Sequence, residues 1–75
     1  MQHRIAPLVR EAATFDAIAD GLARGATVHV RMGNHFGART LLRMCREHRV
    51  KALKRRCQAA AILGRELPST DPVSR

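Results

Sequence analysis

The fold is decided by residues 38–57, which read Ala-Arg-Thr-Leu-Leu-Arg-Met-Cys-Arg-Glu-His-Arg-Val-Lys-Ala-Leu-Lys-Arg-Arg-Cys. Eight of the chain's 14 Lys and Arg residues lie in this stretch, and Glu47 is its one acidic residue. Apolar residues recur along it at helical spacing, so we expect a helix with a charged outer face. The rest of the chain is expected to cover the apolar side of this helix.

The composition outside this stretch indicates a small, mainly α-helical domain. The chain has 75 residues, 45% of them hydrophobic, and Phe15 and Phe36 are its only aromatic residues of the Phe, Trp and Tyr type. An aliphatic, alanine-rich set of apolar residues suits closely packed helices. A domain of this size buries only about 60% of the surface of its unfolded chain, so we expect a homodimer.

Charge and cysteine content suggest the kind of partner and compartment. A net charge of +8 favours a polyanionic partner, either nucleic acid or an acidic protein. The two cysteines do not suggest a disulfide framework, and no apolar run approaches the ~20 residues that cross a bilayer. We therefore expect a cytoplasmic protein that does not bind a membrane.

Hydrophobic periodicity predicts one domain over residues 1–67 that contains three helices. They are expected at about 7–24, 35–47 and 50–66, and Gly33 and Asn34 offer an N-cap to the second. A break at residues 48–50 is expected because a continuous helix would place Arg49 in the same sector as Cys45. Residues 68–75 are polar and contain two prolines, which predicts a disordered tail.

Residues 26–32 allow two interpretations. Apolar and polar side chains alternate between Gly25 and Gly33, which predicts a short strand with Thr27, His29 and Arg31 on its polar side. Such a strand would have to pair with a second copy across a homodimer, because the chain offers no other strand. The alternative continues the first helix to Met32.

A strand followed by two helices resembles the ribbon-helix-helix DNA-binding proteins over residues 26–66. The resemblance implies a dimer whose paired strands enter the major groove. It also implies that Thr27, His29 and Arg31 contact base edges.

A second resemblance is to the small ANR and PerC-like bacterial regulators, over residues 33–57. It is carried by Gly33-Asn34-His35-Phe36-Gly37-Ala38-Arg39-Thr40-Leu41-Leu42 and by Arg55-Arg56-Cys57. The resemblance implies a helical protein that modulates transcription through other regulators or through DNA.

Metal binding and catalysis find no support in the sequence. Cys45-x-x-His48 has no second paired motif with which to complete a zinc site, so no metal is expected and both cysteines are predicted to be small buried residues. The six acidic residues are not paired with a histidine or a nucleophile, which argues against an enzyme. No cofactor is expected, because no phosphate-binding or dinucleotide-binding motif is present.

The leading functional hypothesis is a regulator that binds nucleic acid through the surface of residues 39–56 and affects transcription. Its contacts are predicted to be Arg39, Arg43, Arg46, Lys51, Lys54 and Arg55. Duplex is favoured over single strands, because no aromatic residue lies among these charges to stack on bases. The alternative is a helical adaptor or inhibitor, encoded by a phage or plasmid, that docks on an acidic protein. Helical backbone over residues 26–32 would favour this alternative.

Overall fold

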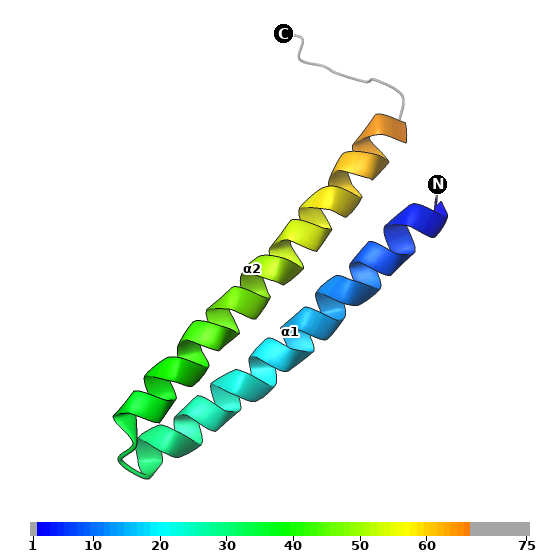
Figure 1. Cartoon of the computed structure of the whole chain (residues 1–75). Coiled ribbons are helices and arrows are strands. Elements are labelled where there is room, and N and C mark those ends of the chain that lie inside the picture. Colours follow the sequence, from blue (N-terminus) through cyan, green and yellow to red (C-terminus); the bar gives the residue numbers. More distant parts are fainter. Residues whose placement is uncertain (1, 67–75) are drawn as a thin grey trace, which may run out of the picture.

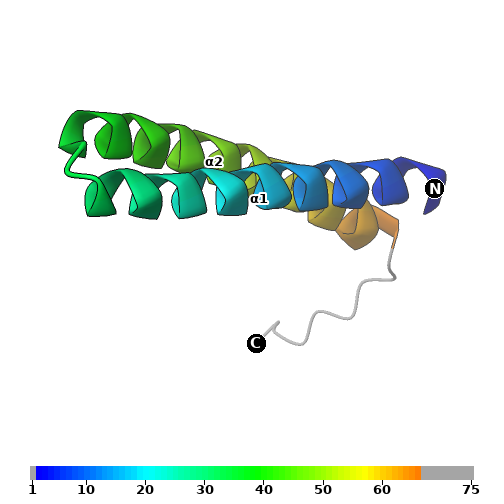
Figure 2. The same cartoon turned by 90° about the horizontal axis from the view of Figure 1, so that it is seen from below.

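The chain folds as two long antiparallel helices packed as a hairpin, as the computed structural model in Figure 1 shows. The structure describes residues 2–66. Helix α1 spans Gln2–Arg31 and helix α2 spans His35–Glu66, and a turn at residues 32–34 joins them. Figure 2 shows the hairpin edge-on, as a ribbon one helix thick in which the two helices cross at a shallow angle. The prediction of a mainly helical fold is confirmed.

The predicted strand at residues 26–32 is wrong, because α1 continues through residue 31. Ala26 is only 3% exposed and packs in the interface between the helices. The Thr27 hydroxyl donates to the Ala23 carbonyl, one helical turn back, at 3.2 Å. Along this segment the helix satisfies backbone groups that a lone strand would leave unpaired. A homodimer built on paired strands is therefore excluded for this fold, and the strand that suggested a ribbon-helix-helix protein is replaced by helix.

The predicted break at residues 48–50 is also wrong, so the three expected helices are two. Helix α2 is continuous over 32 residues. Arg49 and Arg56 do not enter the apolar interface, because they lie at its edge and reach carboxylates of α1. Charged residues in that sector are therefore compatible with an unbroken helix.

The core between the helices repeats every seven residues, the repeat of helices that wind around each other. Small residues occupy one buried position of the repeat in each helix: Ala12, Ala19 and Ala26 in α1, and Ala38, Cys45, Ala52 and Ala59 in α2. Larger, mostly half-buried residues occupy the other position: Leu8, Phe15, Leu22 and His29 in α1, and Leu41, His48, Arg55 and Ile62 in α2. Side chains this small let the two backbones approach closely, so the hairpin is held by contact along its whole length.

The turn is closed by backbone hydrogen bonds at both helix ends. The amide of Asn34 donates to the His29 carbonyl at 2.8 Å and that of Gly33 to the Val30 carbonyl at 3.0 Å, which is the Schellman pattern at a helix C-terminus. Gly33 has a φ of 80°. The Asn34 side-chain oxygen accepts the Gly37 amide at 2.9 Å. The predicted N-cap before His35 is thus confirmed.

Replacing Gly33 with alanine is expected to destabilise the hairpin by about 1–2 kcal/mol, because an L side chain is strained at this φ. No atom lies within 4 Å of a Cβ added at Gly33, so the cost would come from the backbone alone. Gly64→Ala is the matched control, since its Cβ would also meet open space but lies in α2 without a positive φ. Urea denaturation should show a lower midpoint for Gly33→Ala only, and an unchanged midpoint would contradict the turn described here.

Two further expectations concern a membrane span and the C-terminal tail. Neither α1 nor α2, over residues 2–66, has a segment both long and apolar enough to span a bilayer. The predicted tail at residues 68–75 lies outside the described residues, as does residue 67, the last of the predicted domain.

Candidate functional site

The outer side of α2 gathers most of the predicted binding residues. We call the set Arg39, Arg43, Arg46, Lys51 and Lys54 the basic face. All five side chains are exposed. Four of them line a shallow hollow with Glu47 and Val50, and Arg39 lies in an adjoining hollow beside Arg43 and Arg46. One continuous helix therefore presents these cations on a single surface.

Arg55, the sixth predicted contact, points toward α1. Its Nε donates to Glu11 Oε1 at 2.7 Å, and its guanidinium lies 5.6 Å from the centroid of the Phe15 ring. Arg55 is half-buried at an interface position of the seven-residue repeat. Its charge is already neutralised within the hairpin, so we separate it from the basic face.

The other predicted contacts, Thr27, His29 and Arg31, do not share a face. His29 is half-buried between the helices, where its Nδ1 lies 3.0 Å from the Asn34 side-chain nitrogen. Thr27 and Arg31 are exposed. Successive residues of a helix point about 100° apart, so the alternation that suggested one polar side does not apply.

Each of the three carboxylates of α1 forms an ion pair with an arginine of α2. Glu11 pairs with Arg55, while Asp16 lies 2.6 Å from Arg56 and 3.9 Å from Arg49. Asp20 accepts a hydrogen bond from Arg49 at 3.1 Å, and this bond is the main cause that raises the pKa of the Arg49 guanidinium above its ordinary value.

These ion pairs are at least partly exposed to solvent, so each is worth at most about 1 kcal/mol. Their main effect is on the distribution of charge. Arg49, Arg55 and Arg56 are neutralised by α1, whereas in the part of the chain that the structure describes no carboxylate lies within ion-pair distance of the basic face. The basic face therefore keeps its positive charge.

Two exposed apolar residues that the sequence reasoning did not select lie among these cations. Val50 is 48% exposed and Leu53 is 60% exposed. The sequence could have revealed them, because an unbroken helix over this segment places both residues between basic residues on the outer side of α2. The basic face is thus partly apolar.

The cysteines differ from each other. Cys45 is buried between the helices, as predicted, whereas Cys57 is exposed, which the sequence analysis did not expect. The imidazole of His48 contacts the Met44 carbonyl through Nδ1 at 2.8 Å. Among the side chains of residues 4–65, no group of three or more metal-ligating residues comes together.

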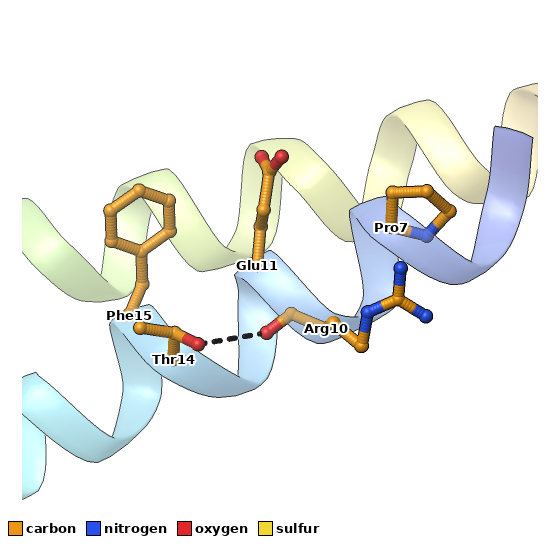
Figure 3. A pocket seen from close by; sticks show the side chains of 5 residues that line it. All are labelled: Pro7, Arg10, Glu11, Thr14 and Phe15. Atoms are coloured by element: carbon orange, nitrogen blue, oxygen red, sulfur yellow. Dashed lines mark hydrogen bonds between the residues drawn. The ribbon is translucent and has the colours of Figure 1, made fainter.

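A further shallow hollow lies on α1 and is shown in Figure 3. It is lined by Pro7, Arg10, Glu11, Thr14 and Phe15. The Thr14 hydroxyl donates to the Arg10 carbonyl at 3.1 Å, while Glu11 and Phe15 contact Arg55 of α2. Three of the five lining residues therefore take part in contacts that stabilise the helices or the hairpin, and we assign this hollow a structural role.

Comparisons with protein-family models, with curated proteins and with solved structures find no match to this chain.

Proposed function

We propose that this chain is a binding module that docks through the basic face of α2 on an acidic surface of a protein partner. The observation that carries the proposal is the separation of charge within the hairpin. The carboxylates of α1 neutralise Arg49, Arg55 and Arg56, while the five cations of the basic face have no such partner among the side chains of residues 4–65. Unpaired cations on one rigid helix attract and orient a partner of opposite charge.

The apolar residues of this face support a protein partner over a phosphate backbone. Val50 and Leu53 are about half-exposed, and apolar anchors surrounded by charges are typical of a helix that docks in a groove of another protein. Residues 26–31 are also helical, so the chain lacks the predicted strand on which the resemblance to a DNA-binding family depended.

Duplex nucleic acid is the second candidate partner. The basic face extends along one helix from Arg39 to Lys54, which is roughly 22 Å at about 1.5 Å per residue. Such a row can contact several phosphates without reading sequence. A regulator of transcription that acts through DNA, as the sequence first suggested, would use this row.

Removing three cations of this face is expected to abolish most of the binding without unfolding the hairpin. The variant is Arg43→Ala, Arg46→Ala and Lys54→Ala, all at exposed positions. The probes are a helical peptide rich in Glu and Leu and a random-sequence DNA duplex, each titrated between about 50 and 200 mM salt. For the duplex, the slope of log K against log salt should become shallower by about 3, since each phosphate that a cation neutralises adds about 0.9 to its magnitude.

The matched control removes the same charge from the outer side of α1 through Arg10→Ala, Arg24→Ala and Arg31→Ala, which are also exposed. It is expected to keep most of the affinity for either probe. Equal weakening in both triple variants would show that only net charge matters and would refute a specific basic face.

A second variant, Val50→Ser with Leu53→Ser, distinguishes the two partners. If the face docks on protein, this variant should weaken peptide binding at least tenfold and leave duplex binding unchanged. Duplex binding with no measurable peptide binding would instead favour the nucleic-acid candidate. Binding to neither probe at low salt would overturn both.

A further inference from the structure

Helix α2 carries a second seven-residue repeat on the side away from α1. Eight residues, spaced alternately four and three positions apart, form a stripe along this side of the helix, which we call the outer stripe. They are Arg39, Arg43, Arg46, Val50, Leu53, Cys57, Ala60 and Gly64. All eight are exposed, whereas the residues of the first repeat are buried or half-buried against α1. The same helix can therefore contact α1 on one side and a partner on the other.

The outer stripe changes character along its length. Its three arginines lie nearest the turn and belong to the basic face, where no carboxylate among the side chains of residues 4–65 is within ion-pair distance. The five residues that follow carry no charge. Val50 and Leu53 are the largest of them and are 48% and 60% exposed, while Cys57, Ala60 and Gly64 are small. The stripe thus has a basic half near the turn and an apolar half toward the end of α2.

We propose that the outer stripe binds a helix of the partner protein, and that this helix carries carboxylates beside the three arginines and apolar side chains beside Val50 and Leu53. The proposal rests on the proposed function, because it names the element of the acidic partner that the basic face contacts. Residues repeated at four and three positions fall on one side of a helix, and a second helix is the element whose side chains match that spacing. The partner helix is therefore expected to lie along α2 with its acidic half beside the turn.

The two halves of the stripe contribute differently to binding. The unpaired cations attract carboxylates and fix the direction in which the partner helix lies. The apolar half supplies surface that is removed from water when the partner covers it. Its small residues let a second backbone approach closely, as the buried small residues do between α1 and α2. Binding therefore requires both a charge match and an apolar match, in a fixed order along the helix.

The dimensions of the stripe set the expected affinity. From residue 39 to residue 64 the stripe extends about 38 Å, at about 1.5 Å per residue. A contact of this length and about one helix diameter, ~10 Å, wide covers about 400 Å² on each partner. Interfaces of this size are typical of weak, transient complexes, so we expect a Kd on the order of tens of micromolar.

A second copy of this chain fits the outer stripe less well than an acidic helix does. In a parallel pair the arginines of the two copies would face each other and repel. In an antiparallel pair they would face the apolar half, where burial of an unpaired charge is costly. Neither arrangement neutralises the basic half, so charge favours a different protein as the partner.

Two synthetic helical peptides of identical composition, each about four heptads long, test the proposal. In the divided peptide, the positions spaced four and three apart carry Glu in one half and Leu in the other. In the mixed peptide, Glu and Leu alternate along the same positions. Fluorescence anisotropy should show that the divided peptide binds at least tenfold more tightly. Equal affinities would overturn this proposal and leave docking on an acidic surface intact, whereas binding of neither peptide at low salt would overturn both.

Two matched variants separate the outer stripe from the rest of the hairpin. Ala60→Glu places a carboxylate in the apolar half, and Ala13→Glu makes the same change of charge on α1, at a residue that is also exposed. The first should weaken binding of the divided peptide at least tenfold, because burial of an unpaired carboxylate is costly. The second should leave the Kd within about twofold of the unmodified chain. Equal effects of the two variants would contradict the assigned stripe.

The exposed thiol of Cys57 reports the contact directly and needs no charged variant. In a chain that carries Cys45→Ala, with oxidised glutathione as the oxidant, Cys57 should form a disulfide with a cysteine placed in the Leu half of the divided peptide. A cysteine placed in the Glu half should react far less. The control chain carries Cys45→Ala, Cys57→Ser and Ala13→Cys, and it should form little disulfide with either peptide. Equal yields from the two halves, or from the two chains, would overturn the proposal.

Discussion

Ala52→Leu is expected to remove a large fraction of the stability of the hairpin. Ala52 is fully buried, at one of the small positions that repeat every seven residues along α2. A leucine there would have to push α1 away or leave its preferred rotamer, and overpacking of this kind costs about 1–3 kcal/mol, sometimes more. A single core in a domain of this size rarely supplies more than about 3–5 kcal/mol, so this cost is a large fraction of the whole.

Ala60→Leu is the control for this change. Ala60 lies on the same helix and is exposed, and leucine and alanine have similar helix propensities. Urea denaturation followed by circular dichroism should show a much lower midpoint for Ala52→Leu and little change for Ala60→Leu. Equal midpoints would show that the helices are not in close contact at Ala52.

Phe15→Ala is expected to destabilise the hairpin by about 2–4 kcal/mol. Its ring is the largest apolar group in the interface, and the Phe15 and His48 ring centroids are 6.1 Å apart. Lys51 Nζ and the Arg55 guanidinium lie 5.8 and 5.6 Å from the same ring centroid. Truncating a fully buried Phe costs about 3–5 kcal/mol, so truncating this half-buried ring should cost about half as much. The loss of each cation–π interaction contributes at most about 1 kcal/mol more.

Phe15→Leu separates these two contributions. It keeps most of the apolar volume and removes the aromatic face, so it should cost only about 1–2 kcal/mol, which is the share of the two cation–π interactions. Thermal or urea unfolding of both variants gives the comparison. A Phe15→Ala variant as stable as the original chain would mean that the ring does not pack against α2.

The helical class and the turn could be predicted from local chemistry. Alanine-rich aliphatic composition favours packed helices, and Asn34 caps α2 through the Gly37 amide, as its position before His35 suggested. Gly33 adopts the positive φ that ends α1. These features depend on a few neighbouring residues, so the sequence reveals them.

The number of helices could not be found from helical periodicity alone. Analysis at about 3.6 residues per turn places Arg49 in the apolar sector, whereas the helices follow a seven-residue repeat that moves it to the edge of the interface, within reach of Asp20. The feature of the sequence that indicates one continuous helix is the recurrence of small residues at every seventh position, at Ala38, Cys45 and Ala52. Alternation at residues 26–32 was misleading, because Ala26 and His29 face α2 as helical residues.

The sequence predicted which basic residues lie on the outer side of α2, but not which of them is neutralised by α1. Five of the six basic residues selected lie together on the basic face, because all are exposed on one helix. The inward position of Arg55 depends on Glu11, which is 44 residues away in sequence. A contact between residues so distant is set by the register of the hairpin, which local patterns do not determine.

The hairpin itself is tested most directly by one distance, between spin labels at Ala6→Cys and Ala60→Cys in a chain that also carries Cys45→Ala and Cys57→Ser. Both label sites are exposed, near the end of the ribbon where the start of α1 lies beside the end of α2 (Figure 1). Doubly labelled chain is diluted in an excess of unlabelled chain, so that only pairs within one molecule are detected. Double electron–electron resonance should give a distance of about 10–25 Å, because packed helices lie about 8–10 Å apart. A distribution beyond about 50 Å, approaching the ~80 Å of one continuous helix, would contradict the hairpin.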